Sequence, residues 1–190
     1  MELRPYQNDA VGAISNQWCQ GHKKTLLVLP TGTGKTIVFS SIVENETKDG
    51  SKALILAHRG ELLDQASDKL KQTSGLGSAL EKAESTSIGS SELVTVASVQ
   101  TLSQEKRLNK FPRDYFKTIV VDEAHHSMSD TYQRILKYFD GANVLGVTAT
   151  PDRSDQKKLG RYFDSKAYEY TIHQAVKEKY LCKVKAQMIP

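Results

Sequence analysis

Short runs of aliphatic and β-branched residues recur along the chain, and each is followed by a polar stretch that is compatible with a helix. The runs predict strands at residues 24–30, 52–58, 93–99, 117–122 and 143–149, and helices near residues 5–20, 35–47, 60–72, 99–108 and 130–139. Three of the runs are almost continuously apolar, which is typical of strands buried on both faces. Because strands and helices alternate, we expect right-handed βαβ crossovers and an α/β fold, with a parallel sheet sandwiched between helices.

Two segments have a less regular pattern. Residues 73–92 are rich in Ser, Gly and Thr, and they predict a long loop or a short hairpin. Residues 168–190 begin with Tyr-Glu-Tyr, continue with a short helix around residues 172–179 and end in alternating lysines and apolar residues. We interpret this last segment as leading toward a further part of the protein.

Composition restricts the class of protein without naming a function. The chain has 190 residues, enough for one sizeable domain, and its 38% hydrophobic and 25% charged residues are typical of a globular chain. We expect neither a membrane-spanning helix nor a secretory signal, because the longest aliphatic run covers only residues 26–29. The two cysteines, Cys19 and Cys182, lack metal-site spacing, which favours a cytoplasmic setting. The net charge of +4 permits an anionic partner.

The segment PTGTGKT at residues 30–36 follows a predicted strand and precedes a predicted helix. In that context backbone N–H groups can surround an anion at the helix N-terminus, and glycines allow close approach to phosphates. Lys35 can reach the β- and γ-phosphates of a nucleotide, and the Thr36 hydroxyl can ligate Mg²⁺. The residues that we predict to bind the phosphates are Thr31, Gly32, Thr33, Gly34, Lys35 and Thr36.

This segment departs from the pattern G-x-x-x-x-G-K-[ST] at one position, because Leu29 stands where the first glycine would be. The alternative interpretation is a glycine-rich turn that only caps a helix. The position between a strand and a helix favours phosphate binding over that alternative.

A second candidate site lies at residues 119–126, where the apolar run Ile-Val-Val ends in Asp122 and Glu123. If this strand neighbours the phosphate-binding segment, Asp122 can hold Mg²⁺ and Glu123 can act as the base that polarises the attacking water. The alternative is a strand that ends in two solvated acids. His125 and His126 lack further ligands at metal spacing, so we interpret them as hydrogen-bonding links.

The order of these segments resembles the superfamily 2 helicases, in their DEAH-like branch. Residues 122–125 read Asp-Glu-Ala-His, which is similar to motif II, and residues 30–36 are similar to a motif I variant that often lacks the first glycine. Further similarities are LRPYQ at residues 3–7 (the Q-motif region), LAHRGEL at 56–62 (motif Ia), VASVQTL at 96–102 (motif Ib) and GVTATP at 146–151 (motif III). Six motifs in order are far more specific than any one of them.

The resemblance implies a P-loop NTPase with a RecA-like fold, the first of the two lobes of an ATP-dependent helicase or translocase. The chain resembles restriction-enzyme translocase subunits such as the type III subunit, XPB-like proteins and bacterial DEAD/DEAH-box proteins alike. ATP and Mg²⁺ are the implied cofactors, with Gln7 reading the adenine edge and Arg4 contacting the nucleotide. We expect the ATP-binding domain at residues 1–170 and a linker at residues 171–190.

The implied partners are a nucleic acid, with DNA favoured over RNA, and a second RecA-like lobe of the same polypeptide; no membrane partner is implied. The second lobe of family members supplies arginines that complete the ATP site. Because such arginines contribute about 10³–10⁵ in rate, we expect this chain alone to bind ATP weakly and to hydrolyse it poorly.

The resemblance also implies nucleic-acid contacts by Arg59 in motif Ia and by Gln100 and Thr101 in motif Ib. The alternative for Arg59 is an ion pair with Glu61 or Asp64 on the helix surface. Two basic stretches, at residues 106–117 and 153–166, also contain acids, and we interpret them as solvated faces.

Thr148 and Thr150 lie at the end of a predicted strand, close to the expected position of Asp122 and Glu123. Together with His125, their hydroxyls can couple the state of the ATP site to movement of the second lobe. The alternative is that they only cap the strand.

Two other functions remain open at this stage. One is a different P-loop enzyme, such as a small-molecule kinase or a signalling ATPase, although neither class needs this order of motifs. The other is a non-catalytic, nucleotide-gated binding module.

Overall fold

A single sheet of seven parallel strands, in the order β3-β4-β2-β5-β6-β1-β7, forms the centre of the molecule. The computed structural model describes residues 2–57, 61–82, 85–149 and 153–182. The strands are β1 (Lys24–Val28), β2 (Ala53–Ala57), β3 (Ser78–Glu81), β4 (Val94–Ser98), β5 (Thr118–Asp122), β6 (Asn143–Thr148) and β7 (Ser165–Glu169). The helices are α1 (Pro5–Cys19), α2 (Lys35–Thr47), α3 (Glu61–Ser74), α4 (Val99–Leu102), α5 (Glu105–Leu108), the 3₁₀ helix η1 (Ala124–Met128), α6 (Asp130–Tyr138), α7 (Arg153–Tyr162) and α8 (Ile172–Lys177).

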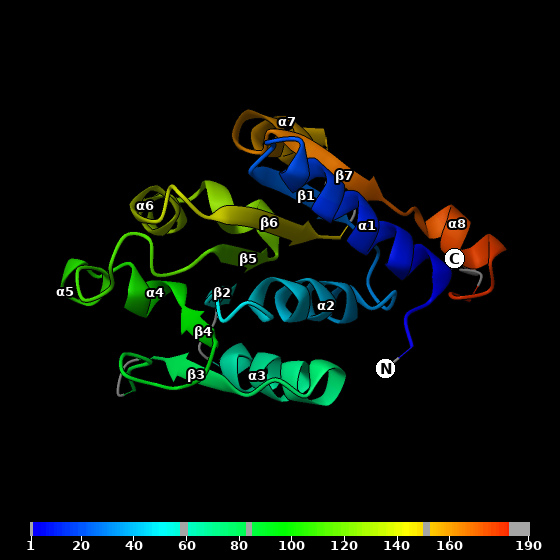
Figure 1. Ribbon diagram of the computed structural model, residues 1–190. Helices are drawn as coiled ribbons and strands as arrows, with labels where there is room; N and C mark the ends of the chain where they lie inside the picture. Colours follow the sequence, from blue (N-terminus) through cyan, green and yellow to red (C-terminus); the bar gives the residue numbers. More distant parts are fainter. Residues whose placement is uncertain (1, 58–60, 83–84, 150–152, 183–190) are drawn as a thin grey trace, which may run out of the picture.

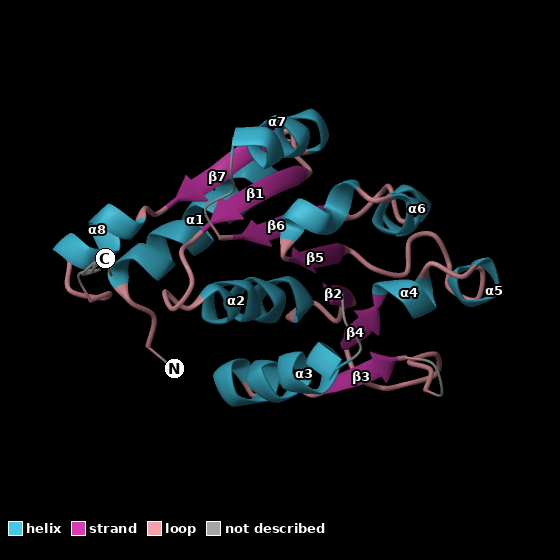
Figure 2. Ribbon diagram, turned by 180° about the vertical axis from the view of Figure 1, so that it is seen from behind, coloured by secondary structure: helices cyan, strands magenta, loops and turns pink. Residues whose placement is uncertain are grey.

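Helices cover both faces of this sheet (Figures 1 and 2), as the alternation of strands and helices predicts. One layer contains α1, α2 and α3 and buries side chains such as Ile14 and Phe39. The other contains α4, α5, η1, α6 and α7 and buries side chains such as Leu102 and Ile135. None of the helices among the described residues has the length and apolar character needed to cross a bilayer.

The central strands are buried on both faces, which explains their continuously apolar sequences. All five residues of β2 and of β4 are buried. Successive side chains of β2 point to opposite layers, so Ile55 belongs to one core cluster and Leu56 to the other. Full burial of such a side chain contributes about 1.5–3 kcal/mol, so these strands stabilise both layers at once.

The five predicted strands are confirmed, but the sequence prediction missed four elements, among them the 3₁₀ helix η1. Residues 78–81, predicted to be part of a loop or hairpin, form β3, which pairs in parallel with β4. Strand β7 and helix α7 were also not predicted. Both missed strands lie at the sheet edges, where one side is unpaired and a continuous apolar run is not required.

The helix predicted at residues 99–108 is divided into α4 and α5. Gln104 has extended backbone angles, with φ −68° and ψ 128°, and it caps the start of α5. The short helix predicted around residues 172–179 is confirmed as α8. Its Ala175 and the preceding Tyr170 are buried in the same core cluster as α1, so this part of the predicted linker packs on the sheet domain.

Gly146 of β6 lies where no larger residue fits. A Cβ atom at this position would lie 2.6 Å from Phe163 Cε1 and 3.1 Å from the Cβ of Ala124. Both side chains belong to the core cluster beneath α7 and η1. The close packing of Phe163 and of η1 on β6 therefore depends on the missing side chain.

We expect Gly146→Ala to destabilise the protein by about 1–3 kcal/mol, because overpacking a dense core forces side chains out of their preferred rotamers. Gly12→Ala, on α1, is the matched control, since no atom lies within 4 Å of its Cβ position. That change should be neutral or stabilising by up to about 1 kcal/mol. Urea unfolding measures both, and equal effects of the two substitutions would contradict this account of the packing.

Candidate nucleotide-binding site

The loop between β1 and α2 has the backbone geometry of a phosphate-binding loop. Gly32 and Gly34 have φ angles of +84° and +83°, a conformation that residues with a Cβ rarely adopt. Gly34 directly precedes α2, so the loop delivers its backbone N–H groups to a helix N-terminus. Thr33 is 1% exposed and donates its hydroxyl to the carbonyl of Pro30 at 2.6 Å, so its side chain stabilises the loop from inside.

Two side chains of α1 hold the same carbonyl of this loop. Tyr6 donates its hydroxyl to the Thr33 carbonyl at 2.7 Å, and Gln7 donates Nε2 to it at 3.2 Å. The Gln7 Oε1 atom accepts from the backbone N–H of Arg4 at 2.9 Å. Gln7 is only 2% exposed, and a Cβ on Gly34 would lie 2.5 Å from its Nε2. Gln7 therefore positions the loop, and its predicted contact with adenine stays a prediction.

Asp122 and Glu123 lie at the end of β5, on the same edge of the sheet as the loop. Glu123 donates its backbone N–H to Asp122 Oδ1 at 2.9 Å. Its own backbone is left-handed, with φ 52° and ψ 57°, which is uncommon for a residue other than glycine. Such conformations cluster at functional sites. The Glu123 Oε1 atom lies 4.0 Å from Lys35 Nζ, so the loop and this carboxylate face each other.

The two predicted Mg²⁺ ligands share a small cavity. Thr36 and Asp122 line a space of about 70 Å³ together with Phe39, Gln65, Ala66 and Lys69. Burial raises the pKa of the Asp122 carboxyl, and the Glu123 charge adds to this, although the backbone hydrogen bond and Lys35 act in the opposite direction. A largely buried carboxylate beside a hydroxyl fits a hard cation that takes oxygen ligands. These residues therefore fit Mg²⁺ with phosphate oxygens and water as its other ligands.

The end of strand β6 lies next to Asp122 and Glu123. The His125 Nδ1 atom lies 3.5 Å from Glu123 Oε2 and 3.5 Å from the Thr148 hydroxyl. Thr148 is 1% exposed at the end of β6, which pairs with both β1 and β5. The histidine thus lies between the carboxylate and the threonine, as its predicted linking role requires. Thr150, the other predicted coupling residue, lies outside the described residues.

The structure describes only two of the three residues that we predict to contact nucleic acid. Arg59 lies outside the described residues. Gln100 is exposed on α4, where its Oε1 accepts from the Ser98 hydroxyl at 2.8 Å, whereas Thr101 is only 8% exposed. Asp64, an alternative partner of Arg59, forms an ion pair with Lys82 at 3.1 Å.

The structure adds aromatic residues that the sequence did not single out for the site. Tyr6 stacks on Tyr170 with ring centroids 4.3 Å apart, and Tyr180 meets the Tyr6 ring edge-on at 5.0 Å. The Arg4 guanidinium lies 4.9 Å from the Tyr180 ring centroid. Leu181 Cδ2 lies 3.4 Å from the position of a Cβ on Gly32. Residues that follow α8 therefore form one wall of the phosphate-binding loop, a long-range contact without a local sequence signal.

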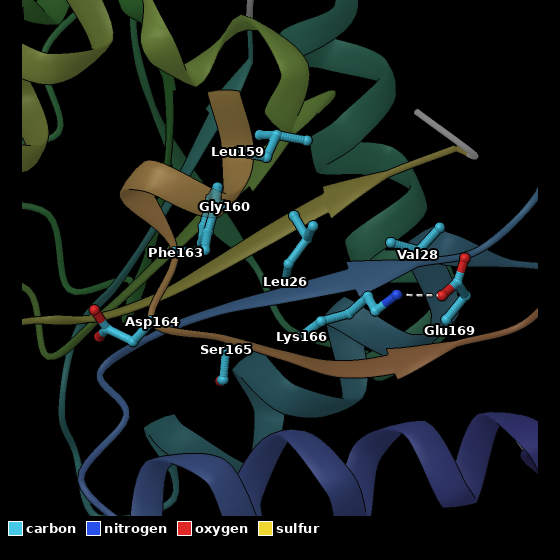
Figure 3. A pocket seen from close by; sticks show the side chains of 9 residues that line it. All are labelled: Leu26, Val28, Leu159, Gly160, Phe163, Asp164, Ser165, Lys166 and Glu169. Atoms are coloured by element: carbon cyan, nitrogen blue, oxygen red, sulfur yellow. Dashed lines mark hydrogen bonds and ion pairs between the residues drawn. The ribbon is translucent and has the colours of Figure 1, made fainter. Parts of the chain in front are cut away.

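A larger cavity, of about 360 Å³, lies between α7 and the neighbouring strands β1 and β7, of which β7 is the edge strand (Figure 3). Its apolar floor includes Leu26, Leu159 and Phe163, and an ion pair between Lys166 and Glu169 lies at its rim. None of the site residues predicted from the sequence is among its lining residues. The nucleotide-binding geometry is thus separate from this cavity.

Residues 1–153 match the family described as "Type III restriction enzyme, res subunit". The chain belongs to this family. Over 96% of its length it is 36% identical to the putative ATP-dependent helicase IRC3 of Saccharomyces cerevisiae, and it is 32% identical over 83% of its length to the DNA 3'-5' translocase XPB2 of Sulfurisphaera tokodaii. It covers 28% and 33% of those two proteins, which is a third of their length or less.

The fold of this chain is also that of the RecA-like lobes of superfamily 2 helicases. A nuclease-deletion mutant of the Type ISP restriction-modification enzyme LlaGI, solved with a DNA substrate mimic, superposes with a TM-score of 0.73 at 20% identity. The superposition covers 95% of this chain and 21% of that enzyme. The predicted fold and the predicted family resemblance are therefore confirmed.

We expect Asp122→Asn to raise the unfolding temperature of the ligand-free protein at neutral pH. The raised pKa means that the ionised carboxylate is disfavoured in the folded state, and the amide removes that charge. Mg²⁺ with ADP should stabilise the parent more than ADP alone, but should give the variant no such increment.

Thermal unfolding followed by circular dichroism measures both effects, with Asp140→Asn at an exposed position as the control. An equal Mg²⁺ increment in the parent and the Asp122→Asn variant would show that Asp122 does not bind the ion.

Proposed function

We propose that this chain is the N-terminal motor lobe of an ATP-dependent nucleic-acid helicase or translocase, which binds Mg²⁺–ATP and a nucleic-acid backbone. One observation carries the proposal: Lys35 of the phosphate-binding loop and Glu123 at the end of β5 approach to 4.0 Å. A phosphate cradle and a base on the same sheet edge are what ATP hydrolysis requires.

Within this proposal each side chain has a distinct task. Lys35 neutralises the β- and γ-phosphates, and the Thr36 hydroxyl and Asp122 hold Mg²⁺. The ion, when bound, neutralises developing charge on the phosphate oxygens. Glu123 accepts a proton from the attacking water, and the Lys35 ammonium lies 4.0 Å from this carboxylate.

Coupling to movement is proposed to run through His125 and Thr148. Glu123 and Thr148 both lie 3.5 Å from His125 Nδ1, so this nitrogen can exchange one partner for the other when the charge at Glu123 changes. Thr148 is the last residue of β6. In this proposal, a change at the γ-phosphate is therefore passed through Glu123 and His125 to the end of β6.

The second RecA-like lobe is the proposed partner that completes the ATP site. The chain covers only 28% of IRC3 and 33% of XPB2, which leaves room for such a lobe in proteins of this kind. We propose DNA as the track, which is supported by the name of XPB2 and by the DNA substrate mimic bound to LlaGI.

The decisive experiment measures ATP hydrolysis by the complete gene product, with and without single-stranded DNA, duplex DNA and RNA at fixed salt. Stimulation by one of them would support a motor and identify its track. Mg²⁺-dependent ATP binding without stimulation by any of them would favour the nucleotide-gated module.

Glu123→Gln and Lys35→Ala should separate hydrolysis from binding. The glutamine retains shape but cannot accept a proton, so hydrolysis by the complete protein should fall by about 10²–10⁴ while ATP affinity stays near that of the parent. Loss of the Lys35 charge should weaken ATP binding by about tenfold to a hundredfold. Titration with a fluorescent ATP analogue gives the affinities, and identical binding by the two variants would refute this division of roles.

Thr148→Val tests the proposed coupling, because valine keeps the shape of threonine and lacks its hydroxyl. Basal ATP hydrolysis should change little, whereas its stimulation by nucleic acid should be largely lost. Thr95→Val, at a buried position of β4, is the matched control. If the Thr148→Val protein is stimulated as strongly as the control, the hydroxyl has no part in coupling.

A further inference from the structure

A cationic cleft lies on the surface between α5 and α6, away from the phosphate-binding loop. The cleft has a volume of about 550 Å³ and is lined by Glu105, Leu108, Asn109, Arg113, Arg134, Lys137 and Tyr138. In Figure 1 the helices α5 and α6 lie at the left, and α8, which precedes the wall of the loop, lies at the right. The lining contains three cationic side chains and one carboxylate.

The basic residues of this region differ in their partners. Arg107 pairs with the fully buried Glu81 at 2.8 Å, and Lys117 pairs with Asp49 at 2.9 Å. These two cations therefore stabilise the fold, and the pairing of Arg107 with a buried carboxylate departs from the interpretation of the stretch at residues 106–117 as a solvated face.

The three cations that line the cleft differ from Arg107 and Lys117 in this respect. Among the described residues, no carboxylate lies within ion-pair distance of Arg113, Arg134 or Lys137. All three are exposed residues. Three uncompensated cations around one cleft create a local positive potential that attracts an extended anion.

Two of the cations are held in place by neutral groups. The Arg113 guanidinium lies 4.7 Å from the Tyr138 ring centroid, and the Tyr138 hydroxyl donates to the carbonyl of Phe111 at 2.7 Å. Arg134 donates to the carbonyl of Ser103 at 3.2 Å. These contacts orient the guanidinium groups without neutralising them, which favours a ligand with a regular array of anionic oxygens.

The cleft adjoins the short helix that carries Gln100. Helix α4 packs against both α5 and α6, and Ser103, which binds Arg134, is its C-cap residue. A four-residue helix spans only about 6 Å, which is close to the spacing of successive phosphates along a strand. Gln100 and the cleft are therefore close enough to contact one nucleic-acid backbone.

We propose that this cleft binds the phosphate backbone of the nucleic acid beyond the contacts made at α4. The inference rests on the proposed function, because it extends the nucleic-acid path of the motor lobe over α5 and α6. The cleft contacts the sugar-phosphate chain and adds affinity without sequence preference. An acidic protein segment is the competing ligand, and the experiment distinguishes the two.

The test compares two double variants of the full chain that remove the same charge. Arg113→Ala with Lys137→Ala removes two cations of the cleft and leaves Arg134 on its carbonyl. Lys106→Ala with Lys110→Ala removes two exposed cations that belong to the same basic stretch but do not line the cleft. Charge-retaining Arg113→Lys with Lys137→Arg controls for packing, and circular dichroism establishes that each variant is folded.

Fluorescence anisotropy measures binding of labelled single-stranded and duplex DNA at salt concentrations from 50 to 200 mM. Loss of two phosphate contacts should weaken binding at low salt and make it less sensitive to salt. Between 50 and 200 mM salt the affinity of both proteins falls. The factor by which it falls should be larger for the parent than for the cleft variant, about seven times larger with single-stranded DNA and about twelve times larger with duplex DNA. The Lys106 and Lys110 variant and the charge-retaining variant should behave like the parent.

Three outcomes would overturn the proposal. Equal effects of the two charge-removing variants would show that only overall charge matters. Normal binding by the cleft variant would show that the nucleic acid does not reach the cleft, while leaving the motor function intact. Absence of nucleic-acid binding by the parent would remove the nucleic-acid partner itself, and cleft-dependent binding of a polyglutamate peptide would then assign the cleft to an acidic protein.

Discussion

The parallel register of β1, β6 and β5 is the constraint on which the candidate site depends. Val28 pairs with Thr148, and Val147 pairs with Asp122, so three strand ends lie side by side at one edge of the sheet. Neighbouring strands are about 4.8 Å apart, a spacing that lets short side chains from consecutive strands touch. A shift of one residue in any pair would turn its alternate side chains into the opposite helical layer. The register thus links the packing of the core to the chemistry at its edge.

The sequence predicts a strand well where the burial of that strand on both faces requires a recognisable run of apolar residues. Strands β2 and β5 are covered on both faces, so their burial requires the continuous aliphatic runs that the sequence displays. Edge strands β3 and β7 do not need a continuous apolar run, and they include polar residues such as Ser78 and Lys166. Their pairing is decided by what lies beside them in space, which a single sequence does not reveal. The fold class could therefore be predicted, but the full width of the sheet could not.

In the candidate site, too, local motifs could be predicted from the sequence, whereas contacts between distant elements could not. That Lys35, Asp122 and Glu123 lie close together could be predicted, because each belongs to a short motif next to a strand end. The wall formed by Tyr180 and Leu181, and the place of Lys69 in the cavity of Asp122, arise from the docking of α8 and α3. The burial of Gln7 was also unforeseen, because the motif identifies the residue but not the direction of its amide. The left-handed backbone of Glu123 has no sequence signature, since glycine and asparagine are the residues that favour it.

The wall of the phosphate-binding loop has a consequence for the order in which the protein is assembled. The loop takes its inner support from Tyr6 and Gln7, which precede it, but Leu181 reaches Gly32 from nearly the opposite end of the chain. During synthesis the loop and its inner support emerge early, whereas the wall emerges late. Contacts of such long sequence separation form slowly, because chain closure has to precede them. The wall of this loop is therefore expected to form after its inner support.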